Sequence, residues 1–82
     1  MPYITPSFRK ALTPTVRPTG PCELNFVLTA VCNEYLQRCG ISYNAVNDVI
    51  GSLECAKLEM YRRRVALYED GRMKEYGDVY LP

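Results

Sequence analysis

The chain has 82 residues, 48% of them hydrophobic and 23% charged, and a formal net charge of +1. This composition is typical of one small globular domain, and the near-zero charge argues against binding nucleic acid through bulk electrostatics. No run of 18 apolar residues occurs, which excludes a transmembrane helix, and the first residues lack the apolar segment of a secretory signal. We therefore expect a cytoplasmic protein with no membrane partner.

Residues 1–21 form a proline-rich N-terminal arm. Thr5 and Pro6 are typical of a helix start, with Thr5 as the N-cap and Pro6 at the first helical position. This pattern predicts a short helix over residues 6–12. Residues 13–21 are predicted to be an extended linker, since a residue that precedes proline is driven away from helical geometry. The arm contains no acid, and its cations are Arg9, Lys10 and Arg17.

Residues 22–82 are predicted to form a helical hairpin domain with a C-terminal tail. The first long helix should begin near Pro21 and end at Cys39, with Gly40 as its C-cap. Ser42 is a good N-cap for the next helix, and so short a connection makes the two helices antiparallel neighbours. The expected core face of the first helix consists of Leu24, Val27, Leu28, Val31, Cys32, Tyr35 and Cys39.

The second long helix is predicted to run from Ser42 to Asp70, with one apolar stripe along it. Lys57 and Arg64 lie on the stripe, and an unpaired buried charge is costly. The stripe should therefore meet an acidic side chain, a second subunit or an anionic ligand. Its apolar members, at helical spacing, are Val49, Ile50, Leu53, Met60, Tyr61, Leu67 and Tyr68.

The second helix is also longer than the first, so part of it must be covered by the arm, the tail or another subunit. Its opposite face carries small residues, which permit close approach of another helix; the alternative is a face that is simply solvated. These small residues are Gly51, Ser52, Cys55 and Ala66. We expect the protein to be a homo-oligomer held together through this helix.

The tail begins with a predicted turn at Asp70-Gly71, and Gly77-Asp78 should break any helix. Val79, Tyr80 and Leu81 then form a short extended apolar tag. So apolar a terminus is expected to dock, either on its own hairpin or on a neighbouring subunit.

The chain has four cysteines and no histidine. In a reducing cytosol the cysteines are expected to be small buried hydrophobes, and without a C-x-x-C pair or a histidine we expect neither a metal site nor a cofactor. The missing imidazole also removes the ordinary serine and cysteine nucleophile pairs. Carboxylates on the second helix are expected to pair on the surface, Glu54 with Lys57 and Glu59 with Arg63. The protein is therefore not expected to be an enzyme.

The strongest chemical signal is arginine next to tyrosine. Arginine binds phosphate in a bidentate manner, and the face of a tyrosine ring stacks on a base. The predicted ligand-binding residues are therefore Arg64 and Lys57 for phosphate and Tyr61 or Tyr68 for the base, with Arg63 beside them. The alternative is that Arg64 pairs with a carboxylate across a subunit contact while its stem covers apolar surface.

Four segments resemble a family of short bacterial and phage proteins with no established activity. In this chain they are residues 23–27 (ELNFV), 51–63 (GSLECAKLEMYRR), 68–70 (YED) and 76–80 (YGDVY). The resemblance implies a setting in the cytosol of a bacterial host. Relatives have proline where this chain has Leu67, which implies that the helix runs further here.

We therefore predict an all-α fold: a short N-terminal helix, a long antiparallel helical hairpin and an extended tail, assembled through helices. The predicted function is a non-catalytic oligomeric binding module that sequesters an anionic nucleotide signal of host immunity. This follows by analogy with compact helical phage proteins that hold cyclic nucleotides. The alternative is a protein-interaction or inhibitor module that binds a host protein through the apolar stripe or the C-terminal tag.

Overall fold

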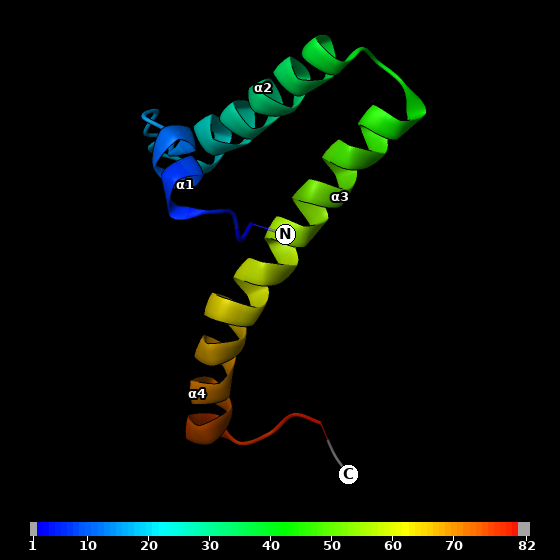
Figure 1. Cartoon of the computed structure of the whole chain (residues 1–82). Helices are drawn as coiled ribbons and strands as arrows, with labels where there is room; N and C mark the ends of the chain where they lie inside the picture. Colours follow the sequence, from blue (N-terminus) through cyan, green and yellow to red (C-terminus); the bar gives the residue numbers. More distant parts are fainter. Residues whose placement is uncertain (1, 81–82) are drawn as a thin grey trace.

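The computed structural model describes residues 2–80, and the described chain is all α-helical, as predicted. A short helix α1 is followed by the long helix α2 and then by a second, longer helical rod (Figure 1). The rod consists of α3, a π-helical turn η1 and α4, which follow one another without a break. The elements are α1 (Pro6–Leu12), α2 (Pro21–Cys39), α3 (Tyr43–Met60), η1 (Tyr61–Val65) and α4 (Ala66–Tyr76).

The predicted starts of the helices are confirmed. Proline occupies the first turn of both α1 and α2, where its missing N–H costs nothing. Ser42 caps α3, its hydroxyl accepting a hydrogen bond from the amide of Ala45 at 3.1 Å. Thr5 has the extended backbone of an N-cap residue, but its side chain makes no capping hydrogen bond. Gly40 ends α2 with a φ of 81°, which a residue with a side chain rarely adopts.

The predicted turn at Asp70-Gly71 is wrong. The second helix continues through Gly71 as part of α4 and ends only at Tyr76, where Gly77 has a φ of 90°. A glycine inside a helix costs about 1 kcal/mol relative to alanine. A contact that bridges this position, that of the Arg72 guanidinium with the ring of Tyr68 at 5.9 Å from the centroid, favours continuation. The helix continues through Leu67, where the chain has no proline to break it.

The two long helices form an antiparallel hairpin that is open. They are in contact next to their connecting loop and diverge away from it, as Figure 1 shows. Tyr35 on α2 donates a hydrogen bond to Asp48 on α3 at 3.2 Å. The part of the N-terminal arm that precedes α1 reaches across to α3 (Figure 1). There the Tyr3 hydroxyl donates a hydrogen bond to Glu59. The arm and the hairpin loop therefore hold α3 at two points.

The predicted core is not enclosed within one chain. Among residues 2–80, Ala45 alone is buried, with 5% of its surface exposed. Val27 and Cys32 on α2, which were expected in the core, are only half-buried. The cysteines are not the buried hydrophobes expected, because the other three are exposed. The radius of gyration is 17.0 Å, whereas a compact chain of this length has about 12 Å. The apolar faces therefore lie open in the isolated chain.

Candidate ligand-binding site

The basic segment of the second long helix has π-helical geometry. Residues 61–65 (YRRRV) form η1, in which backbone hydrogen bonds span five residues instead of four. Such turns insert one residue into an otherwise regular helix, and they are frequent at functional sites. Here the inserted turn coincides with the run of three arginines, Arg62, Arg63 and Arg64.

The extra residue changes which side chains share a face. A residue in an α-helix turns by 100°, so every side chain after η1 is rotated back by about 100° relative to an unbroken helix. Tyr61 consequently meets Glu69, eight positions later, and its hydroxyl donates to the carboxylate at 2.6 Å. The pKa of the Tyr61 phenol is raised, first by this hydrogen bond and then by the charge of Glu69. The same rotation turns Leu67 away from the stripe to which unbroken spacing assigned it.

Arg63 and Arg64 line a hollow of about 360 Å³ between the N-terminal arm and the second long helix. Tyr3 of the arm forms another wall, so an aromatic ring lies in the same hollow as the two guanidinium groups. Within the described residues, neither arginine forms an ion pair. The Glu59 carboxylate lines the same hollow, and its pKa is lowered first by the hydrogen bond from Tyr3, with a smaller contribution from the charge of Arg63.

Arg62 has a structural role instead. Its guanidinium donates to Glu59 at 2.7 Å, so the predicted partner of Glu59, Arg63, is wrong. Arg62 and Arg63 lie three and four residues after Glu59, and both spacings allow an ion pair on a helix, so spacing alone did not decide between them. The pKa of Arg62 is raised, first by this hydrogen bond and then by the charge of Glu59. The Glu59 carboxylate therefore joins the arm, through Tyr3, to the start of η1.

Acid is expected to release the N-terminal arm. The pKa of Glu59 is lowered from 4.5, first by the hydrogen bond from Tyr3 and then by that from Arg62. A lowered pKa means that this contact stabilises the structure above pH 4.5 and is lost as the pH falls through the pKa of Glu59 itself. An NMR titration should show the Glu59 carboxyl and the Tyr3 ring changing together.

Tyr3→Phe should move the midpoint of Glu59 upward, toward 4.5. Tyr43→Phe serves as the matched control, because Tyr43 is an exposed tyrosine at the start of α3. If the titration midpoint of Glu59 were the same in the two variants, the hydrogen bond from Tyr3 to Glu59 would not be what holds the N-terminal arm on α3.

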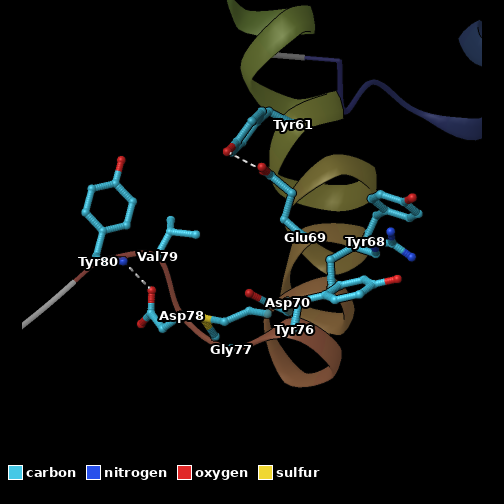
Figure 2. Close-up of a pocket in the computed structure, with 11 residues that line it drawn as sticks. Tyr61, Tyr68, Glu69, Asp70, Tyr76, Gly77, Asp78, Val79 and Tyr80 are labelled. Carbon is cyan, nitrogen blue, oxygen red and sulfur yellow. Dashed lines mark hydrogen bonds between the residues drawn. The ribbon is translucent and has the colours of Figure 1, made fainter.

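A second hollow, of about 490 Å³, lies between α4 and the tail. Figure 2 shows Tyr61 and Glu69 on the rod, and Tyr80 on the tail that turns back beside it. Arg72 lies over the rings of Tyr68 and Tyr76, 5.9 and 4.6 Å from their centroids, at spacings of four residues. Its guanidinium is thus already engaged by the chain's own tyrosines.

The structure divides the predicted ligand-binding residues among three places. Arg63 and Arg64 line the first hollow, whereas Tyr61 and Tyr68 line the second. Lys57 lines neither, and its ammonium pairs with Glu54 at 3.2 Å, which confirms the predicted surface pair. One chain therefore does not bring the five residues together.

Sequence reasoning missed Tyr3 and Arg72. The spacing of Tyr68, Arg72 and Tyr76 at intervals of four could have revealed the stacked arginine, once the helix was extended past Gly71. No local signal identifies Tyr3, because its position beside η1 depends on the path of the whole arm.

No helix in residues 2–80 is long and apolar enough to cross a membrane. The same residues contain no group of three or more carboxylates and cysteines placed to hold a metal ion.

Neither the curated proteins nor the solved structures include a match to this chain. Residues 1–79 match the model of a protein family. The match includes every described helix and all residues that line the two hollows, apart from Tyr80. The resemblance to a family without an established activity is in keeping with this match. The chain belongs to the family described as "Domain of unknown function (DUF6899)".

Proposed function

We propose that the protein is a non-catalytic module that works as an oligomer and binds an anionic ligand of the nucleotide class, in the cytosol of a bacterial host. The observation that carries the proposal is the open apolar surface of the single chain. The absence of histidine from the sequence supports a binding role over catalysis.

The exposed area supports self-association. The chain exposes 7850 Å², whereas a compact folded protein of its mass exposes about 5,000 Å². The difference, about 2,800 Å², is as large as the surface that one subunit contributes to an extensive obligate interface. Large apolar side chains such as Ile50 and Phe26 make up much of this surface. Packing against further copies would supply the core that the chain lacks.

The first hollow supports anion binding. Arg63 and Arg64 lie side by side in the sequence on η1, and both reach the hollow that Tyr3 also lines. Guanidinium groups bind phosphate with charge-assisted hydrogen bonds, and a tyrosine ring stacks on a base. In an oligomer a neighbouring copy would contribute Lys57, Tyr61 or Tyr68 to the same ligand, because one chain does not bring them together.

Native mass spectrometry of protein purified from its host tests this proposal. The expected result is an oligomer with extra mass that denaturation releases as a nucleotide. Adding that nucleotide back should raise the melting temperature of the wild type. Arg63→Ala and Arg64→Ala should each weaken binding by about 10- to 150-fold, the range for one charge-assisted hydrogen bond.

Arg38→Ala is the matched control, since Arg38 is an exposed arginine on α2 paired with Glu34. A bare oligomer whose stability falls on Arg64→Ala would contradict nucleotide binding and assign Arg64 to an ion pair between subunits. A bare monomer would contradict the proposal as a whole.

A second candidate is a module that binds a host protein. The observation that favours it is the tail, in which Val79 and Tyr80 are 87% and 84% exposed. Leu81, the last residue of the predicted tag, lies outside the described residues. A tag docked on its own hairpin would be less exposed than Val79 and Tyr80, so this tag is open to another molecule.

A further inference from the structure

The second hollow is acidic as well as aromatic. Three carboxylates line it, Glu69, Asp70 and Asp78, against one cation, Arg72, which lies over Tyr68 and Tyr76. None of the three carboxylates forms an ion pair within the described part of the chain. The rings of Tyr61 and Tyr80 form other walls (Figure 2). Carboxylates together with aromatic faces suit a cation that is carried on an apolar stem.

Helix α1 has the complementary chemistry. Phe8 and Leu12, four residues apart, share one face and are both exposed. Arg9 flanks this face and Lys10 lies on the opposite side of the helix, and neither forms an ion pair within the described residues. A helix of seven residues with no buried side chain is too short to be stable in isolation. It therefore requires a surface against which to pack.

One chain cannot bring these two surfaces together. Figure 1 shows α1 beside the start of α2, whereas the tail leaves the far end of the long rod. The arm is held in its place by the hydrogen bond from Tyr3 to Glu59 on α3. A contact between α1 and the second hollow must therefore join two copies.

We infer that α1 of one copy docks into the hollow between α4 and the tail of a second copy. Phe8 and Leu12 cover the apolar wall there, Arg9 beside them meets Asp70 on α4, and Lys10 on the opposite side of α1 meets Asp78 on the tail. This inference rests on the proposed self-association and names one of its interfaces. Because each chain carries both surfaces, the contact is made twice in a two-fold dimer or once per subunit in a ring.

Charge reversal tests the inference with the full-length chain. The first variant carries Asp70→Lys and Asp78→Lys, and the second carries Arg9→Glu and Lys10→Glu. Each should raise the dissociation constant of the oligomer at least about tenfold at low salt, where surface charges act most strongly. Mixed in equal amounts, the two variants should assemble together, because each contact between unlike variants again pairs opposite charges: the basic α1 with the acidic hollow, and the acidic α1 with the lysine-bearing hollow.

Sedimentation velocity gives the dissociation constants, and circular dichroism verifies that the variants remain helical. Glu54→Lys on α3 is the control, since Glu54 is an exposed carboxylate outside the hollow. Variants that assemble like the wild type, or a mixture that does not recover, would overturn the docking of α1 and leave the proposed oligomer intact. A wild type that is monomeric at every concentration would instead refute the self-association itself.

Discussion

Ile50→Glu on α3 is expected to dissociate the protein into monomers. Ile50 is 60% exposed in the single chain, and Val46 and Leu53 beside it on the same face are also exposed. In an oligomer this face would be covered. Two copies of a buried isoleucine contribute about 3 kcal/mol or more to association. The dissociation constant should therefore rise at least about 100-fold.

Dissociation should also reduce the helix content. Most of the stability of helices in proteins comes from packing. In the described part of a single chain only Ala45 is buried, so a monomer has little packing to stabilise its helices. Sedimentation velocity and circular dichroism should therefore report parallel losses. Ile41→Glu is the control: Ile41 is 73% exposed in the hairpin loop, so the same substitution there should have little effect. An Ile50→Glu variant as large and as helical as the wild type would show that this face is not an interface.

Insertion of one alanine after Arg63 is expected to rotate everything that follows it. The π-turn already accommodates one extra residue, so a further residue adds one helical step, and α4 turns by about 100° relative to α3. Tyr61 then loses its contact with Glu69, now 2.6 Å long. The pKa of the Tyr61 phenol, which that contact raises, should fall toward its ordinary value of 10.0.

The insertion should preserve the helix and disrupt assembly. In the wild type, Arg72 and Tyr76 continue the face of Ile50 and Leu53 because of the π-turn, whereas a further residue would rotate both of them away from that face. Losing this alignment should weaken association at least about tenfold, which is less than the burial of one large side chain.

Deletion of Arg63 is the matched control for the insertion, since it closes η1 as an ordinary α-turn and leaves Tyr61 and Glu69 seven positions apart, on one face. Tyrosine absorbance against pH measures the phenol, and sedimentation velocity measures assembly. An insertion variant with the Tyr61 titration and the association of the wild type would show that assembly does not depend on the register of α4.

Local signals in the sequence were strong at the ends of helices. Pro6, Pro21 and Ser42 each act on the few backbone groups nearest to them, so the positions of the first three helix starts could be predicted. Asp70-Gly71 was misleading for the same reason. It is a local turn signal, and helix contacts on both sides of it outweighed its small cost.

The π-turn could not be predicted from periodicity. It lies in Arg62, Arg63 and Arg64, where no apolar residue marks a face, so one inserted residue leaves the pattern before it unchanged. Its effect appears only afterwards, in the pairing of Tyr61 with Glu69. The predicted single arginine and tyrosine site failed to form within one chain for this reason, and because the path of the N-terminal arm brings Tyr3 to Arg63 and Arg64.

The sequence by itself determined an all-α chain, its first three helix starts, a helix break at Gly77 and the surface pair of Lys57 with Glu54. These features depend on residues within about one helical turn of each other, whose interactions the order of the chain specifies. Only the tertiary structure decided that the hairpin is open, that its core face is exposed, and that Tyr3 reaches Glu59. Those features depend on contacts between residues distant in the sequence, and their position is set by the packing and direction of whole helices.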